Sequence, residues 1–192
     1  MHDANPIVFV VDDEPAITRA LSRLIGTFGL QCRTFSSAQE FLHTSLPDVP
    51  GCLVLDVFLP GMTGLELQEK LAEAEIEMPI IFMTAQAEVP ISVRAMKAGA
   101  IEFLTKPFGE HELLQAIQRG IERDCSSRQQ RARRRDLKNR FDSLTPREKE
   151  VFVLVTRGLL NKQTAAQLGT REKTIKVHRA QVMDKMSADS LA

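Results

Sequence analysis

The chain has 192 residues, 43% of them hydrophobic, and a formal net charge of zero; this length suits two domains of unequal size. It has no apolar run of the ~20 residues that a membrane-spanning helix needs, and its first residues lack the basic start of a secretory signal. The three cysteines are widely spaced and odd in number, which argues against a disulfide framework or a zinc site, so we expect a cytoplasmic protein with no membrane partner.

The first half alternates strand-like apolar runs with stretches of helical period. Strands are expected at 7–11, 31–35, 51–56, 79–85 and 101–104. Helices are expected from Pro15 to about Gly29, from about Ala38, at 65–75, at 91–99 and from about Glu110. Five strand-then-helix repeats predict an α/β fold, a doubly wound, five-stranded parallel sheet with helices on both faces, in a domain spanning 1–122.

The helix from Glu110 has no clear end in the sequence. Its apolar spacing dissolves into CSSRQQRARRRDLKNR at 125–140, which has good helix formers and almost no apolar seam. We interpret 123–142 as a basic linker, helical or partly ordered, whose arginines either contact DNA phosphates or are simply solvated.

The segment 143–192 is helical and short. Thr145, Pro146 and Glu148 form a capping-box pattern, and a helix follows to about Gly158. A second helix is expected from the N-cap Asn161 to Gly169, and a third from after Thr170 to about Met186. Three helices with tight turns predict a small all-α helix-turn-helix domain.

The two halves of the chain carry opposite charge. Residues 1–122 contain 8 Lys/Arg and 17 Asp/Glu, a net charge of −9, whereas residues 123–192 contain 17 and 8, a net charge of +9. A polyanion would be attracted to the second half alone, unless the split is a coincidence of solvated faces.

Charged and hydroxyl side chains stand where the predicted strands end. Asp12 and Asp13 follow the first strand, Asp56 ends the third, Thr84 ends the fourth and Lys106 follows the fifth. Ligands bind at this edge of a doubly wound sheet, and crowded carboxylates need a cation or protons. We therefore expect these residues to bind Mg²⁺, a cation that prefers oxygen ligands, through Asp12 or Asp13 and through Asp56. The alternative is that these side chains only cap strand ends and form surface ion pairs.

This arrangement predicts phosphoryl transfer to a carboxylate. Asp56 is the candidate nucleophile, because a carboxylate can form an aspartyl phosphate. The Lys106 ammonium would balance the charge of the transferred group, and the Thr84 hydroxyl would donate a hydrogen bond to it.

These residues resemble the receiver domain of bacterial two-component response regulators. The resemblance rests on VVDDE (10–14), LDVFLPGMTGLEL (55–67), Thr84-Ala85 and Lys106-Pro107-Phe108, and it covers residues 6–122. It implies a flavodoxin-like sheet of strand order 2-1-3-4-5.

The receiver resemblance also implies roles for particular residues. Asp56 would be phosphorylated by a partner histidine kinase, and the backbone carbonyl of Phe58 would be a further Mg²⁺ ligand. The Lys106–Pro107 bond would be cis. Thr84 and Phe103 would form the switch pair, although Phe103 lacks the hydroxyl of the more common Tyr. Phosphorylation would then favour a homodimer through the fourth helix and fifth strand.

The last predicted helix has a basic face, which either contacts DNA or is the solvated side of an ordinary amphipathic helix. Ile175, Val182 and Met186 share the face that should pack inward. Residues on the opposite face are expected to contact base edges in the major groove. A second group of residues is expected to contact backbone phosphates. The base-facing residues are Lys173, Lys176, Val177 and Ala180, and the phosphate-facing residues are Lys162, Thr174 and Arg179.

Residues 144–186 resemble the LuxR-type helix-turn-helix, so the whole chain is similar to the FixJ/NarL class of regulators. The resemblance implies base contacts by Lys176 and Val177, double-stranded promoter DNA as a partner, and RNA polymerase as a further one. Thr164 stands where that family usually has Ile or Val, so its buried hydroxyl would need a partner. The chain ends at Ala192, where the family begins a fourth helix; either the sequence is truncated there or this domain dimerises weakly.

Two other functions compete with a DNA-binding regulator. A phosphatase with an aspartate nucleophile would also use Mg²⁺ and Lys, but it usually has an acid two residues after the nucleophile, where this chain has Phe58. A relay whose tail binds a protein is the other alternative, and salt-dependent DNA binding separates it from a regulator. We expect the chain not to be an enzyme.

Overall fold

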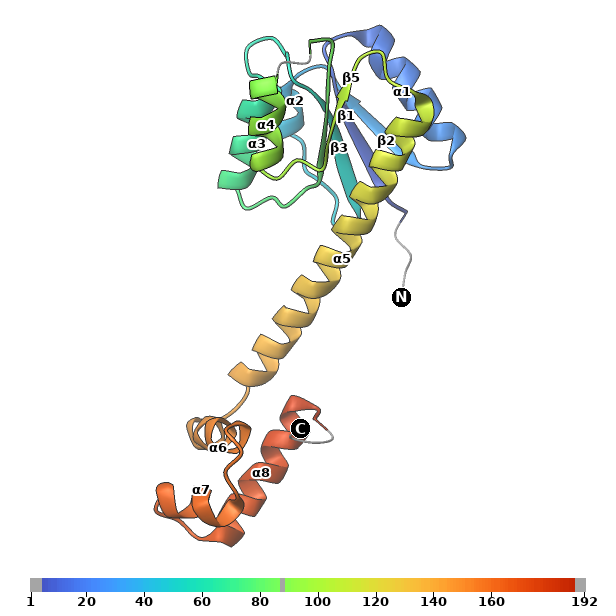
Figure 1. The fold of residues 1–192 in the computed structure, drawn as a ribbon. Helices are drawn as coiled ribbons and strands as arrows, with labels where there is room; N and C mark the ends of the chain where they lie inside the picture. Colours follow the sequence, from blue (N-terminus) through green and yellow to red (C-terminus); the bar gives the residue numbers. More distant parts are fainter. Residues whose placement is uncertain (1–4, 87–88, 189–192) are drawn as a thin grey trace. The chain divides into compact units, whose positions relative to one another are not determined.

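The computed structural model of the chain describes residues 5–86 and 89–188 and divides into two compact units, 1–128 and 129–192 (Figure 1). The strands are β1 (Ile7–Val11), β2 (Gln31–Phe35), β3 (Gly51–Asp56), β4 (Ile80–Thr84) and β5 (Glu102–Thr105). The helices of the first unit are α1 (Pro15–Thr27), α2 (Ala38–Leu42), α3 (Gly64–Glu73), α4 (Val89–Lys97) and the start of α5 (Glu110–Asp142). The second unit adds α6 (Pro146–Thr156), α7 (Asn161–Gln167) and α8 (Glu172–Met186).

The five strands form one parallel sheet in the order β2-β1-β3-β4-β5. The doubly wound, flavodoxin-like fold is therefore confirmed. β1, β3 and β4 are buried along their whole length, as their continuous apolar runs predict for central strands of a covered sheet. Because all strands run the same way, their carboxyl ends meet at one edge.

Two hydrophobic cores lie on the two faces of the sheet. Side chains of α2, α3 and α4, including Phe41, Leu67 and Ala95, pack against one face. Side chains of α1 and α5, including Ile25 and Leu113, pack against the other, so the helices divide three and two between the faces (Figure 1). This division leaves the edge at the carboxyl ends open for a ligand site.

Most helix starts follow their sequence signals. Pro15 opens α1, and Thr145 and Glu148 exchange both hydrogen bonds of a capping box at α6, as predicted. The fourth helix begins at Val89, two residues before the expected start. Pro90 belongs to the first turn, where a missing N–H costs nothing because that N–H has no partner within the helix.

The predicted N-cap at Asn161 is wrong by one residue. Leu160 is the N-cap of α7, and its N–H donates to Gln163 Oε1 at 2.8 Å. Asn161 is the first residue of the helix, and its Oδ1 accepts a hydrogen bond from Arg179 Nη1 of α8 at 3.1 Å. The Asn161 side chain therefore links α7 to α8, and the Gln163 side chain accepts the hydrogen bond from the Leu160 N–H, which has no partner within the helix.

Residues 125–140 belong to α5, which continues without interruption over 33 residues. Its first part packs on the sheet, whereas residues 129–139 are all exposed.

No helix among the described residues is long and apolar enough to cross a membrane.

Thr164 lies in the core of the second unit, where its hydroxyl is enclosed. The residue is fully buried, and among the described residues no group forms a hydrogen bond with Oγ1. We expect Thr164→Val to raise the free energy of unfolding of this unit by about 1–2 kcal/mol, because valine has a similar volume and leaves no polar atom unpaired. Urea unfolding followed by circular dichroism measures the change. Thr164→Ser keeps the hydroxyl and loses a methyl group, so it should destabilise; a destabilised valine variant would show that the hydroxyl is satisfied.

Candidate functional site

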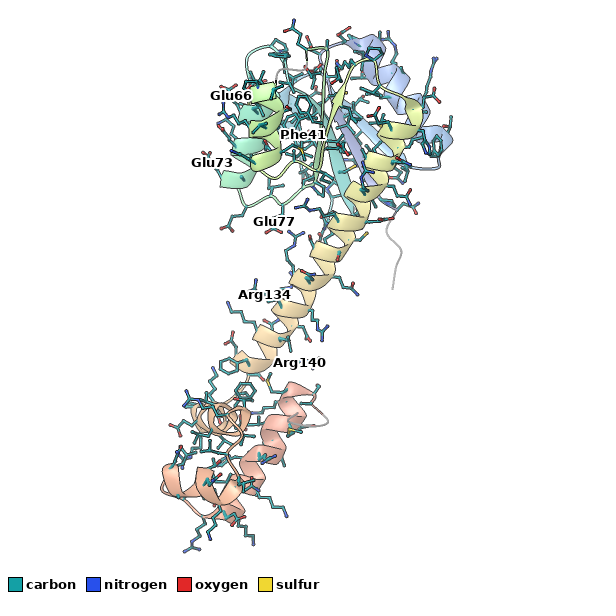
Figure 2. All side chains as sticks on the ribbon, in the orientation of Figure 1. Phe41, Glu66, Glu73, Glu77, Arg134 and Arg140 are labelled. Atoms are coloured by element: carbon teal, nitrogen blue, oxygen red, sulfur yellow. The ribbon has the colours of Figure 1, made fainter. Side chains whose placement is uncertain are left out.

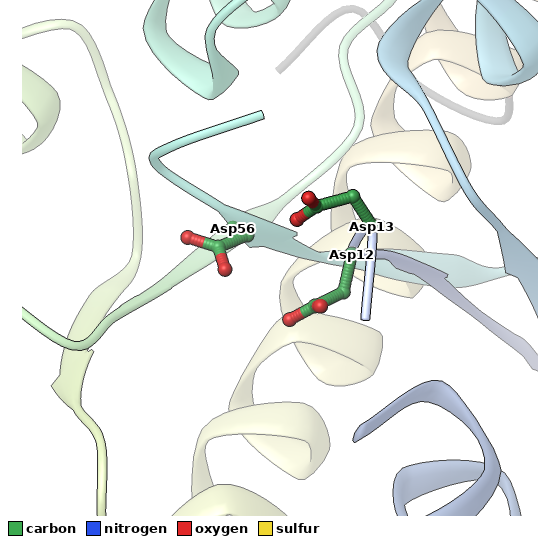
Figure 3. Close-up of side chains that lie close together, drawn as sticks. All are labelled: Asp12, Asp13 and Asp56. Atoms are coloured by element: carbon green, nitrogen blue, oxygen red, sulfur yellow. The ribbon is translucent and has the colours of Figure 1, made fainter. Parts of the chain in front are cut away.

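Three carboxylates gather at the carboxyl ends of β1 and β3 (Figure 3). Asp12 and Asp13 directly follow β1, and Asp56 is the last residue of β3. One oxygen from each lies within 4.8 Å of the other two. Three hard oxygen donors at this spacing suit Mg²⁺, which binds carboxylates, water and phosphate oxygens.

Lys106 joins this cluster from the loop after β5. Its Nζ donates to Asp12 Oδ2 at 2.7 Å and to Asp56 Oδ2 at 2.6 Å. Although burial lowers the pKa of Lys106, its bonds to the two carboxylates outweigh that effect and raise the pKa above its usual range. The ammonium is therefore charged at neutral pH and lies beside the carboxylate that would accept a phosphoryl group.

The Asp12 carboxyl is the most deeply buried of the three acids. Burial raises its pKa above the ordinary value, and this outweighs the lowering by the Lys106 ammonium and by the Glu14 N–H, which donates to Oδ1 at 2.8 Å. The nearby Asp56 charge raises the pKa further. A divalent cation would relieve this crowding of negative charge, so the donor set fits the expected metal.

The backbone around Asp56 holds its carboxylate in position. Phe58 N–H donates to Asp56 Oδ1 at 3.0 Å, and Val57 N–H donates to the Met83 carbonyl at 3.1 Å. A Cβ on Gly64, at the start of α3, would lie 2.2 Å from the Asp56 carbonyl oxygen. Only glycine therefore lets α3 pass this close to the end of β3.

The structure places the other predicted pocket residues on the same edge but in different contacts. The Thr84 hydroxyl is fully buried and exchanges hydrogen bonds with the backbone of Gln86, both at 3.2 Å. The Phe103 ring packs against Phe82, with ring centroids 6.2 Å apart. Phe58 directs a half-exposed ring outward, and the Lys106–Pro107 bond is cis.

The predicted DNA-contacting residues lie on or beside α8. Ile175 and Val182 are buried and Met186 is partly buried, as the inward face requires. Val177 is 53% exposed, and Arg179 is half-buried against Asn161. The other predicted contact residues are exposed: Lys162, Lys173, Thr174, Lys176 and Ala180. This face is a basic surface with small apolar groups at its centre.

Two buried polar side chains of the first unit have no signal in the sequence that marks them as buried. Gln68 of α3 donates through Nε2 to the carbonyls of Ala95 and Ala98, both at 3.3 Å, and so ties α3 to the end of α4. Asp124 of α5 accepts from the Gly51 N–H at 3.0 Å, which fixes the start of β3. Their polar character favours an exposed position, and nothing local in the sequence contradicts it.

Comparison with known families assigns both units. Residues 8–118 match the model described as "Response regulator receiver domain". Residues 142–192 match the model described as "Bacterial regulatory proteins, luxR family". Together the two matches cover most of the chain and divide it at α5.

Relatives with similarity over the whole chain include three curated proteins. "Nodulation protein W" of Bradyrhizobium diazoefficiens is 49% identical over 186 residues, 97% of this chain and 82% of that one. "Response regulator protein TmoT" of Ectopseudomonas mendocina is 42% identical, over 100% of this chain and 87% of its own. "Transcriptional regulatory protein FixJ" of Bradyrhizobium diazoefficiens is 38% identical over 96% of this chain and 90% of its own length.

Two solved structures are similar along both units. The response regulator StyR is 48% identical, with a TM-score of 0.90 over 98% of this chain and 95% of that one. Full-length FixJ from B. japonicum is 36% identical, with a TM-score of 0.58 over 96% of this chain and 91% of that one.

Proposed function

Because the chain belongs to the response regulators that join a receiver domain to a LuxR-family DNA-binding domain, we propose that it controls transcription when a histidine kinase phosphorylates Asp56. The observation that carries this proposal is the contact of one Asp56 oxygen with the Lys106 ammonium, inside a cluster of three carboxylates. That contact pairs an acceptor oxygen with the charge needed to neutralise an incoming phosphoryl group. The chain acts as a regulator in the cytoplasm and not as an enzyme.

The transfer itself needs only positioning and charge. An Asp56 oxygen attacks the phosphorus, the bond from phosphorus to the kinase histidine nitrogen breaks, and the histidine keeps the electron pair. Asp12, Asp13, Asp56 and the Phe58 carbonyl would hold Mg²⁺, which supplies positive charge to the phosphoryl oxygens when bound. Lys106 supplies a second positive charge from the protein.

The switch would begin at Thr84. Its hydroxyl bonds to the Gln86 backbone in this structure, and a phosphoryl oxygen on Asp56 would compete for it. Turning Thr84 toward the phosphate would free space for Phe103 to bury its ring, which changes the face formed by α4 and β5. Val89, Val93 and Met96 already expose apolar surface on α4, which supports a homodimer through this face.

DNA binding would be the task of α8. Its 15 residues are about 22 Å long, which suits the major groove. Lys176 and Val177 would contact base edges, Ala180 and Lys173 would lie beside them, and Lys162, Thr174 and Arg179 would contact phosphates. Promoter DNA is the partner, and RNA polymerase is the further partner that transcriptional activation requires.

A phosphatase function has less support. Such a reaction needs an acid or base near Asp56 to hydrolyse the phosphoaspartate, and the residue two positions later is Phe58, whose side chain offers no proton. The exposed basic face of α8 would also have no use in that function.

Sedimentation and duplex binding of the full chain, with and without acetyl phosphate and Mg²⁺, test the proposal. We expect the donor to double the mass and to raise the affinity for duplexes selected from a random pool by at least about tenfold, since dimerisation joins two half-sites. Lys176→Ala should lose about 1–3 kcal/mol of discrimination between selected and random duplexes. An unchanged mass and affinity after confirmed phosphorylation would refute the switch, and equal binding of all duplexes would refute the reading of bases by α8.

A further inference from the structure

The second half of α5 is an exposed basic helix without a structural role in either core. We call residues 129–142 the linker helix; they include six Lys/Arg and two Asp/Glu. Every residue from 129 to 139 is exposed. Apolar packing therefore does not hold this stretch, and its surface is available to a ligand.

Three cations of the linker helix lie on one face of it. Arg134 and Arg135 lie four and three residues before Lys138, so their side chains are its neighbours, and like charges at this spacing destabilise a helix. None of the three forms an ion pair within 5–86 and 89–188, and the nearby Asp136 is taken by Arg140 at 2.9 Å. Figure 2 shows the Arg134 side chain projecting away from the helix. A polyanion would relieve this repulsion.

The end of the linker helix is attached to the DNA-binding unit beside the last turn of α8. Arg140 Nη1 donates to the Met186 carbonyl at 3.0 Å, and Lys185 Nζ donates to the Ser143 carbonyl at 3.5 Å. The Phe141 ring meets the Phe152 ring of α6 edge-on, with centroids 5.4 Å apart. Arg140 thus fastens the linker helix to α8, whereas the helical period places Arg134, Arg135 and Lys138 on the other side of the linker helix, clear of this attachment.

We propose that the linker helix is a second DNA-contacting surface, in which Arg134, Arg135 and Lys138 bind backbone phosphates of the duplex that α8 occupies. The inference rests on the proposed DNA-binding function and extends its contact area. A duplex carries a charge every ~1.7 Å, and Arg134 and Lys138 are separated by about 6 Å of helical rise, so the three cations can meet several neighbouring phosphates. These contacts are independent of base sequence and add affinity and register.

The test compares two triple variants of the full chain. Arg134→Gln, Arg135→Gln and Lys138→Gln together remove three charges, and glutamine retains helix propensity. The matched control, Arg19→Gln with Arg23→Gln and Arg33→Gln, removes three exposed charges from α1 and β2. Binding to a labelled duplex of arbitrary sequence, about 30 base pairs long, is followed by anisotropy from about 50 to 200 mM salt.

We expect only the linker variant to change the salt dependence. Its slope of log affinity against log salt should be smaller by about 2 to 3, since each lost phosphate contact removes ~0.9, so the ratio of wild-type to variant affinity should shift roughly fortyfold across this range. Equal slopes for the linker variant and the wild type, or equal losses in both variants, would overturn the inference and leave DNA binding by α8 intact. Absence of salt-dependent binding by the wild type would instead refute the proposed function, and this inference with it.

Discussion

Asp56→Asn is expected to abolish phosphorylation of the chain by acetyl phosphate and Mg²⁺. The carboxylate oxygen is the nucleophile in the proposed transfer, and an amide in its place is a far weaker one. The substituted asparagine has nearly the same shape, and its side-chain oxygen can still accept from the Phe58 N–H, which donates to Asp56 Oδ1 at 3.0 Å. The fold should therefore persist. Intact-mass spectrometry should show one phosphoryl adduct on the natural chain and none on the variant.

Asp13→Asn is the matched control for this loss. It also removes one carboxylate from the cluster, yet it leaves the acceptor oxygen and the Lys106 contact unchanged. We expect a slower appearance of the same adduct, because Mg²⁺ is held less tightly. An adduct of equal yield on the Asp56→Asn chain would show that phosphate is accepted elsewhere.

Gly64→Ala is expected to lower the free energy of unfolding by about 3 kcal/mol or more. The new Cβ would lie 2.2 Å from the Asp56 carbonyl oxygen and 3.1 Å from Leu55 Cγ. The first of these atoms is a backbone oxygen at the end of the central strand β3, so α3 and β3 must move apart at the end that carries Asp56. Thermal unfolding by circular dichroism measures the loss, and the phosphoryl adduct should form more slowly in the same variant.

Gly26→Ala tests the same substitution where space is free. Gly26 lies in α1, and a Cβ there meets no heavy atom within 4 Å. Alanine reduces the freedom of the unfolded chain and favours the helix, so stability should rise by about 0.5–1 kcal/mol. If the stability falls in Gly64→Ala and rises in Gly26→Ala, the close approach of the backbone is what excludes a side chain at Gly64. Similar effects at both would contradict it.

The strands and the pocket were predictable because both depend on local pattern and on one rule of topology. Continuous apolar runs mark β1, β3 and β4 as buried strands, and alternation with helices makes the sheet parallel. Once the strands are parallel, Asp12, Asp56 and Lys106 must lie at the same edge of the sheet, although they are up to 94 residues apart in the chain. A local rule thus predicted a long-range cluster.

Contacts that depend on a partner far along the chain were not predictable. Asn161 has the character of an N-cap, but Arg179 of α8 takes its side chain, so the helix begins one residue earlier in register. Asp124 lies at the edge of a polar stretch, yet it is 2% exposed and binds the start of β3. Secondary-structure propensity reflects a residue and its neighbours in sequence, whereas the contacts of Asn161 and Asp124 depend on residues far away in the chain.

The sequence by itself determined the strand and helix order, the acidic edge, the split of charge between the two halves and the inward face of α8. Each follows from periodicity or from the sign of charge, which act over a few residues. Only the tertiary structure decided that Lys106 contacts Asp12 and Asp56, that Gly64 must lack a side chain, and that Arg140 fastens the linker helix to the end of α8. These contacts join residues from separate elements at distances of a few ångströms, and packing alone sets such distances.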